Sequence, residues 1–178
     1  IRPAAGLAIS ELHSLGIGPV AMLTGDNRGT ARALGEAVGV DEIGWELLPE
    51  DKVALVKDLM SRCGTVAMVG DGVNDAPALA TATVGIAMGA AGSDVALDTA
   101  DVALMSDDLS RIPYVVRLGR KTLEVISQNI AVALGIKLVA VVLVFLGVAG
   151  LWAAVVADMG SSLLVTANAM RLSRTQGR

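Results

Sequence analysis

The sequence predicts an α/β domain built on a parallel β-sheet, followed by a transmembrane α-helical hairpin. Short aliphatic runs alternate with helical patterns up to about residue 106, as in a sheet made of βαβ units. Two later apolar stretches each approach the roughly 20 residues that cross a bilayer as a helix. Charge divides in the same way: residues 1–113 hold 7 Lys and Arg against 16 Asp and Glu, and residues 114–178 hold 7 against 2.

The elements of the first part, residues 1–106, follow from the alternation of patterns. Four aliphatic runs that end in glycine or polar residues are expected to be strands, at 20–23, 65–69, 84–88 and 101–105. Helical patterns occupy the intervals, at 4–15, 28–38, 50–60 and 74–80. Because buried strands that alternate with helices form parallel sheets, polar residues just past the strand ends are expected to line a ligand crevice.

Candidate phosphate-binding residues follow the first strand and open a later helix. Thr24 precedes Gly25 and Asp26 in a strand-to-helix turn, where its hydroxyl and backbone N–H can hold a phosphate oxygen. Lys52 opens a helix after Pro49 and supplies a positive charge for the same anion. Each of these signals is weak alone, because such turns and helix-starting lysines are common.

The glycine-rich turn after the second strand is a stronger signal. It reads Gly70-Asp71-Gly72-Val73-Asn74-Asp75. The carboxylates of Asp71 and Asp75 are hard oxygen ligands that suit a Mg²⁺ ion which keeps its waters. A simple Asx-type turn is the alternative, but two carboxylates in one glycine turn need a cation or a tight network. Together with Thr24 and Lys52, the turn indicates phosphoryl-transfer chemistry.

Composition excludes other classes of function. Aromatic residues are 2% of the chain and the net charge is −4, which disfavours a nucleic-acid-binding protein. The single cysteine, Cys63, excludes an internal disulfide framework and a zinc site made of several cysteines. We expect His13 to lie on the surface, and Cys63 and Trp45 to pack in the interior.

The membrane part is expected to contain a juxtamembrane helix at 107–128, spans at 129–147 and 151–172, and a tail at 173–178. Basic residues flank both ends of the hairpin, whereas the glycine turn between the spans has no charge. The positive-inside rule therefore places both hairpin ends, and the acidic domain, in the cytoplasm. A buried helix pair in a soluble protein is the alternative, but few aliphatic residues elsewhere could cover this surface.

Two charges lie within the spans. Lys137 is 10 residues before Gly147 and Asp158 is 7 residues past Leu151, which places them roughly 15 Å and 11 Å from the outer end. Since charges at bilayer depth usually face a partner or a wet pathway, we expect Lys137 and Asp158 to face one another. Further polar groups on the second span either take part in function or join the helices: Ser161, Ser162, Thr166 and Asn168.

The motifs in order resemble a known family. The strings Thr24-Gly25-Asp26, Pro49-Glu50-Asp51-Lys52 and Gly70 to Pro77 are similar to the phosphorylation domain of P-type ATPases, which belong to the haloacid dehalogenase-like superfamily. Residues 128–137, Asp158-Met159-Gly160 and residues 165–172 resemble the Zn²⁺/Cd²⁺/Pb²⁺ exporters of the heavy-metal, type IB branch. The resemblance covers essentially the whole chain.

The resemblance implies roles for the soluble residues. Thr24, in its motif with Gly25 and Asp26, would bind an aspartyl phosphate together with Lys52. The glycine-rich turn after the second strand would bind Mg²⁺ through Asp71, and Asp75 and Asn74 would complete or orient the ligand shell of the ion. In the whole enzyme an aspartate attacks the γ-phosphate of ATP, and the phosphoenzyme drives a cation across the membrane.

In the membrane, the resemblance implies that Asp158 ligates the transported metal and that Lys137 is its counter-ion. The copper branch instead has a Tyr-Asn pair in the first of these helices, and a Met with two downstream serines in the second. No tyrosine lies in the hairpin, although Met159 with Ser161 and Ser162 partly matches the copper pattern at a different spacing. A copper pump therefore stays an alternative.

The chain departs from the family by what it lacks. It has no Asp-Lys-Thr-Gly-Thr nucleophile string, nucleotide-binding domain, actuator domain or Cys-Pro-Cys helix, and it begins without Met. We therefore expect a C-terminal fragment of a pump in the plasma (inner) membrane, which is inactive alone and has the missing N-terminal portion, the lipid bilayer and heavy-metal cations as partners. The sheet is expected to lack its central nucleophile strand, between the strands that end at Leu23 and Val69.

Two alternatives from other classes remain. One is a phosphatase of the same superfamily anchored in the membrane, in which Lys137 and Asp158 would be dispensable. The other is a regulatory fragment without enzymatic activity that competes for partner subunits.

Overall fold

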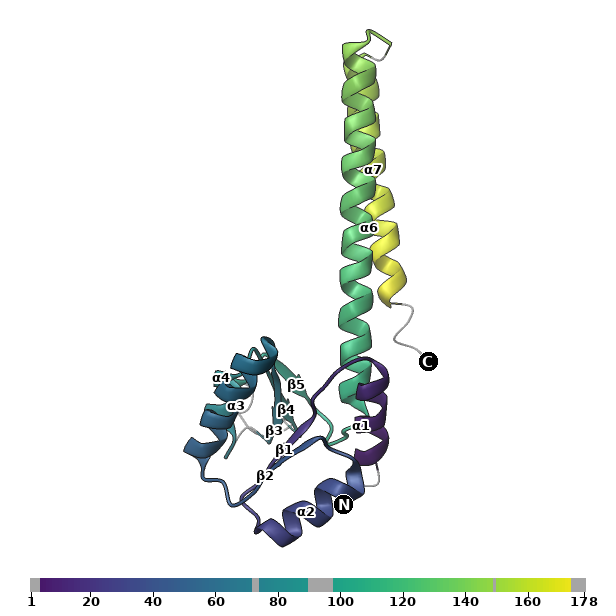
Figure 1. The fold of residues 1–178 in the computed structure, drawn as a ribbon. Coiled ribbons are helices and arrows are strands. Elements are labelled where there is room, and N and C mark those ends of the chain that lie inside the picture. The colour runs from purple at the N-terminus through teal and green to yellow at the C-terminus, as the bar shows by residue number, and fades with distance from the viewer. Residues whose placement is uncertain (1–3, 72–73, 90–97, 149, 174–178) are drawn as a thin grey trace. The chain divides into compact units, whose positions relative to one another are not determined.

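The computed structural model describes residues 4–71, 74–89, 98–148 and 150–173 (Figure 1). The chain divides into two compact units, Ile1–Tyr114 and Val115–Arg178. The first unit alternates helices and strands, and the second is helical, so the expected α/β domain and helical hairpin are both present.

The first unit contains nine described elements before the long helices. In chain order they are α1 (Ala5–Ser14), β1 (Ala21–Leu23), α2 (Arg28–Val38), β2 (Glu42–Gly44), α3 (Pro49–Cys63), β3 (Ala67–Gly70), α4 (Ala76–Thr81), β4 (Val84–Met88) and β5 (Val102–Leu104). Local chemistry explains several boundaries. The side chain of Asn27 accepts the N–H of Thr30 and caps α2, and Pro49 occupies the first turn of α3.

The described strands form two separate parallel sheets. β1 pairs with β2, and β3, β4 and β5 pair in that order. The break falls between β1 and β3, which is where the sequence predicted that a central strand is lacking. β2 was not predicted, because Ile43 is the single aliphatic residue of a three-residue strand and its neighbours Glu42 and Gly44 do not favour strands.

An apolar cluster joins α3, β3 and α4. Val56, Met68, Ala78 and Leu79 are buried in it, and Leu23 and Val53 pack against it. Leu23 directly precedes Thr24, and Val53 directly follows Lys52. The cluster therefore anchors the segments that carry the candidate site residues.

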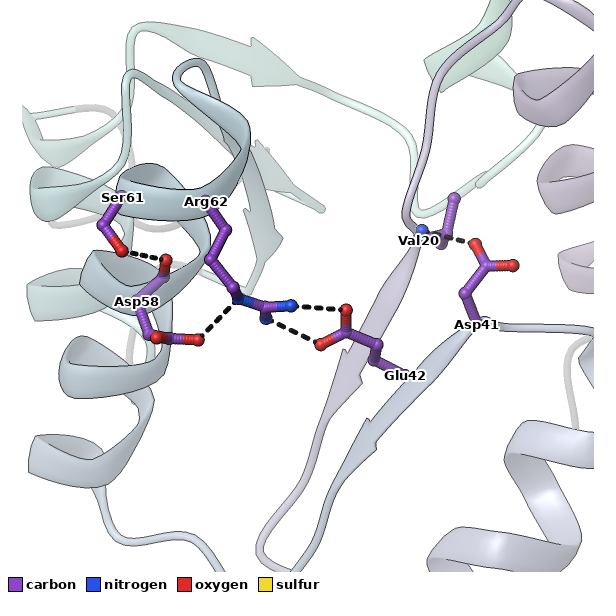
Figure 2. Close-up of polar contacts among 6 residues, drawn as sticks. All are labelled: Val20, Asp41, Glu42, Asp58, Ser61 and Arg62. Carbon is purple, nitrogen blue, oxygen red and sulfur yellow. Dashed lines mark hydrogen bonds and ion pairs between the residues drawn. The ribbon is translucent and has the colours of Figure 1, made fainter.

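Arg62 joins β2 to α3 through ion pairs (Figure 2). Its Nη1 and Nη2 atoms donate to Oε1 and Oε2 of Glu42 at 3.0 and 2.8 Å, and its Nε donates to Oδ2 of Asp58 at 2.9 Å. The hydrogen bonds from Arg62 hold the pKa of the Glu42 carboxyl below its usual 4.5. Just before β1 and β2, the N–H of Val20 donates to Asp41 at 2.7 Å, and this bond lowers the pKa of Asp41.

These lowered pKa values predict an acid-sensitive fold. A carboxyl whose pKa is lower in the folded chain stabilises it above the unfolded pKa, and that contribution is lost as the pH falls through the folded value. For Glu42 the loss therefore begins near pH 4.5 and continues downward. We expect Glu42→Gln to flatten the decline of the unfolding midpoint below this pH, as followed by circular dichroism. Glu36→Gln, whose partner Arg32 lies on the same helix, is the control and should leave the decline unchanged. An equally steep decline in Glu42→Gln would contradict the prediction.

The second unit is formed by two long helices. α6 (Arg111–Phe145) and α7 (Leu151–Ser173) lie side by side and antiparallel (Figure 1). Among the described residues, α6 is the one helix found long and apolar enough to cross a membrane. The expected juxtamembrane helix and first span form this single helix. It begins at Arg111 rather than 107 because Asp108 accepts the N–H and hydroxyl of Ser110 in a turn just before it. The span predicted at 151–172 coincides with α7, and its crossing of a membrane stays a prediction.

Two expectations about single residues were wrong. Trp45 is 40% exposed, and its ring lies 5.2 Å from the guanidinium of Arg28, because a cation–π contact holds it at the surface. Cys63 is exposed because it is the last residue of α3, beyond the apolar cluster. His13 lies at the surface as expected, and its Nε2 is 2.8 Å from Oδ2 of Asp41.

Candidate functional site

Thr24 lies in the turn between β1 and α2. Its hydroxyl donates to Oδ2 of Asp26 at 3.0 Å and accepts the N–H of Asp26 at 3.1 Å. The backbone ties this turn to the next loop, since the N–H of Leu47 donates to the Thr24 carbonyl and the N–H of Glu46 donates to the Asp26 carbonyl. These two bonds fix the turn, with the Thr24 hydroxyl at the carboxyl end of β1. The N–H of Thr24 donates to the Gly44 carbonyl at 3.0 Å, so the expectation that this N–H holds a phosphate oxygen was wrong.

Lys52 and Asp75 form the most enclosed ion pair among the described residues. The Nζ atom of Lys52 lies 2.6 Å from Oδ1 of Asp75, and the two side chains are only 15% and 17% exposed. Lys52 is in the first turn of α3, where Asp51 accepts the N–H of Leu48 and fixes the start of the helix. The sequence grouped these residues by their chemistry, and the structure brings them into direct contact.

Gly70, the last residue of β3, leaves the space that Asp75 occupies. A Cβ atom at position 70 would lie 2.8 Å from both the Cβ and the Oδ2 of Asp75, closer than such atoms pack. A glycine here therefore lets the Asp75 carboxylate lie against the strand end and reach Lys52. The following residue, Asp71, is exposed and accepts the N–H of Asn74 at 3.3 Å. Gly72 and Val73 of the same motif lie outside the described residues.

The donor set can be tested for its fit to Mg²⁺. Asp71 offers an exposed carboxylate, and the Oδ1 atom of Asp75 is engaged by Lys52. Among the described residues no group of three or more His, Cys, Asp or Glu side chains could hold a metal alone. Mg²⁺ commonly binds through one or two carboxylates together with waters and phosphate oxygens, so the residues present fit it as part of a shell.

The hairpin contains the second candidate site. The Nζ atom of Lys137 lies 3.2 Å from Oδ1 of Asp158, which confirms that these two charges face one another. Both side chains line one groove between α6 and α7, with Ala140 and Ala157 beside them. A carboxylate and its counter-ion on neighbouring helices can accept a cation if the lysine is displaced from the carboxylate.

The polar residues that follow Asp158 bond mainly within their own helix. The hydroxyls of Ser161 and Ser162 both donate to the Asp158 carbonyl, at 2.8 and 3.1 Å. Thr166 donates to the Ser162 carbonyl at 2.8 Å. Asn168 differs, because it donates across the hairpin to Asn129. Asn129 was not singled out in the sequence, although a polar residue at the start of an apolar span is the signal that could have found it.

The chain is similar to known proteins in sequence. Residues 1–83 match the family model of haloacid dehalogenase-like hydrolases. The chain is 56% identical over 99% of its length to a probable cadmium-transporting ATPase of Listeria monocytogenes, and 50% identical over 98% to the zinc/cadmium/lead-transporting P-type ATPase of Escherichia coli. It spans about a quarter of each relative, 25% and 23%.

Solved structures agree with the sequence relatives. The crystal structure of a zinc-transporting PIB-type ATPase in an E2.Pi state superposes on 97% of the chain, with a TM-score of 0.89 and 50% identity, and 28% of that protein is covered. A structure of the catalytic domain of CopB-B, a CPx-ATPase, matches 65% of the chain with a TM-score of 0.57 and 35% identity. The fold of both units is therefore that of the corresponding part of such a pump.

Proposed function

Because the chain belongs to the heavy-metal, type IB branch of the P-type ATPases, we propose that it is part of a pump that exports Zn²⁺, Cd²⁺ or Pb²⁺ at the expense of ATP. The chain supplies part of a phosphate site in its first unit and a charged metal ligand in its second. Relatives that transport metals, together with the apolar helix α6, mark it as part of a membrane protein.

The observation that carries the proposal is the Lys137–Asp158 pair. An ammonium and a carboxylate, here 3.2 Å apart on two apolar helices, are costly in a bilayer, and charges that are kept there usually mark an ion pathway. A hard carboxylate prefers a divalent cation such as Zn²⁺ or Cd²⁺ over the softer Cu⁺, which favours the thiolates and thioethers of Cys and Met. The Asp158 carboxylate would bind the metal, and the Lys137 ammonium would form an ion pair with that carboxylate once the metal has left.

The soluble residues would handle a phosphoryl group carried by an aspartate of the longer pump. Thr24 would donate its hydroxyl to a phosphoryl oxygen after that hydroxyl leaves Asp26, to which it donates in this structure. Lys52 would place its charge beside the same oxygens, held in position by Asp75. Asp71 would hold Mg²⁺, with Asp75 and Asn74 around it. When bound, the ion would offset negative charge on the phosphoryl group.

The proposal also places the chain in the membrane. The basic residues Arg117, Arg120 and Lys121 on α6, and Arg171 on α7, lie toward the ends of the helices away from the turn at Gly147. By the positive-inside rule these ends, and with them the acidic first unit, would face the cytoplasm. The plasma membrane is the proposed location.

ATP hydrolysis by the full-length pump tests the proposal. We expect Zn²⁺, Cd²⁺ or Pb²⁺ to stimulate hydrolysis in proteoliposomes and copper salts to fail, and we expect cells that make the pump to survive zinc salts better than copper salts. Stimulation by copper alone would replace the proposal with the copper pump. The 178-residue chain by itself should hydrolyse neither ATP nor a generic phosphomonoester, and Mg-dependent turnover from it would favour the membrane-anchored phosphatase.

A further inference from the structure

A polar contact joins the two helices of the hairpin away from the Lys137–Asp158 pair. The Nδ2 atom of Asn168 on α7 donates to Oδ1 of Asn129 on α6 at 2.8 Å, and both side chains are half-buried. The Nη1 atom of Arg171 donates to Oδ1 of Asn168 at 3.1 Å. The amide nitrogen of Asn168 therefore bonds across the hairpin, and its amide oxygen bonds to a residue of its own helix.

The two cross-helix contacts belong to one helix register. Asn129 is 8 residues before Lys137, and Asn168 is 10 residues after Asp158, which is roughly 12 and 15 Å along the respective helices. Because the helices are antiparallel and these two distances are nearly equal, a single register of α6 against α7 brings Asn129 to Asn168 and Lys137 to Asp158. A slip by one helical turn, about 5.4 Å, would break both.

The other residues of this interface carry little directional information. The two grooves between the helices are lined, apart from Lys137 and Asp158, by Gly, Ala, Val, Leu, Ile and Phe side chains. In lipid such apolar contacts change little when helices slide, whereas a hydrogen bond between helices is lost. A single buried asparagine pair sets register in helical coiled coils by the same physics.

We propose that Asn129 and Asn168, with Arg171, form a register lock that positions Asp158 opposite Lys137. They are positioning residues, since they act on the metal ligand through the alignment of the helices. The lock's effect on transport rests on the proposed function, whereas its effect on helix alignment does not. The two effects are therefore measured separately.

Helix alignment is measured on the full 178-residue chain in lipid nanodiscs. Spin labels at Leu134→Cys and Leu163→Cys, in a Cys63→Ser background, report the distance between exposed positions of α6 and α7 by pulsed electron resonance. We expect Asn129→Ala/Asn168→Ala to broaden the distance distribution or shift it by up to a turn. Thr166→Ala, which loses a bond within α7 only, should leave it narrow. An unchanged distribution in the double variant would overturn the lock.

Transport is measured on the full-length pump. We expect Asn129→Ala and Asn168→Ala each to raise the zinc concentration for half-maximal ATPase activity by about 3- to 15-fold at similar kcat, the range that loss of one such bond implies. The double variant should match Asn168→Ala, because that single variant already removes the bond that Asn129→Ala removes, together with the bond from Arg171. Additive effects, or a fall in kcat with an unchanged half-maximal concentration, would overturn the lock. A pump without any metal stimulation would instead contradict the proposed function and leave the spectroscopic result standing.

Discussion

Asp158→Ala in the full-length pump is expected to abolish metal-stimulated ATP hydrolysis. Loss of a residue that merely supports a metal ligand costs roughly 10- to 100-fold in affinity or activity, and loss of the ligand itself should cost more. The substitution also leaves the Lys137 ammonium, 3.2 Å from the lost carboxylate, without this counter-ion in an apolar hairpin. Hydrolysis measured against zinc concentration in proteoliposomes checks the expectation.

Ser162→Ala is the matched control for Asp158→Ala. It removes a hydroxyl that donates to the Asp158 carbonyl at 3.1 Å, and that carbonyl keeps the hydroxyl of Ser161 at 2.8 Å. We therefore expect metal stimulation close to that of the unmodified pump. Normal stimulation in Asp158→Ala would show that the carboxylate does not ligate the metal, whatever its partner.

Lys52→Met is expected to have two separable effects. In the 178-residue chain it leaves the Asp75 carboxylate, 17% exposed, without its partner, which should lower the free energy of unfolding by about 3 kcal/mol. In the full-length pump it should also prevent formation of a stable phosphoenzyme, because the charge beside the phosphoryl oxygens is gone. Denaturant unfolding and phosphoenzyme trapping with labelled ATP measure the two effects.

The double variant Lys52→Met/Asp75→Asn distinguishes structure from chemistry. Removing both charges together should recover most of the stability, since no carboxylate is left unpaired, but it should not recover phosphorylation. Lys57→Met, on the same helix and exposed, is the control for both measurements. Full phosphorylation in Lys52→Met would refute the role of this lysine in the phosphate site.

The outlines of the fold and the Lys137–Asp158 pair could be predicted from the sequence. The strand at 84–88 and the helix at 28–38 were placed to the residue, because aliphatic runs and helical patterns are local signals. Lys137 and Asp158 were matched by arithmetic alone, since helices have a fixed rise per residue.

Other features depend on contacts that no local pattern encodes. β2 has a single aliphatic residue and forms through its pairing with β1, and the Lys52–Asp75 contact joins residues 23 positions apart. Trp45 and Cys63 were assigned to the interior because of their residue types, whereas their positions after β2 and at the end of α3 keep them at the surface. The Asn129–Asn168 bond spans 39 positions and was missed for the same reason.

The separation of β1–β2 from β3–β4–β5 makes the first unit suitable for a split-protein reporter. Each sheet ends in a parallel strand whose backbone groups can accept another strand by β-augmentation. A segment of matching hydrophobicity supplied in trans could pair with β1 on one side and with β3 on the other, and would then join the two sheets next to Thr24. Reconstitution from two polypeptides could then be followed as a gain of signal rather than as a loss of activity.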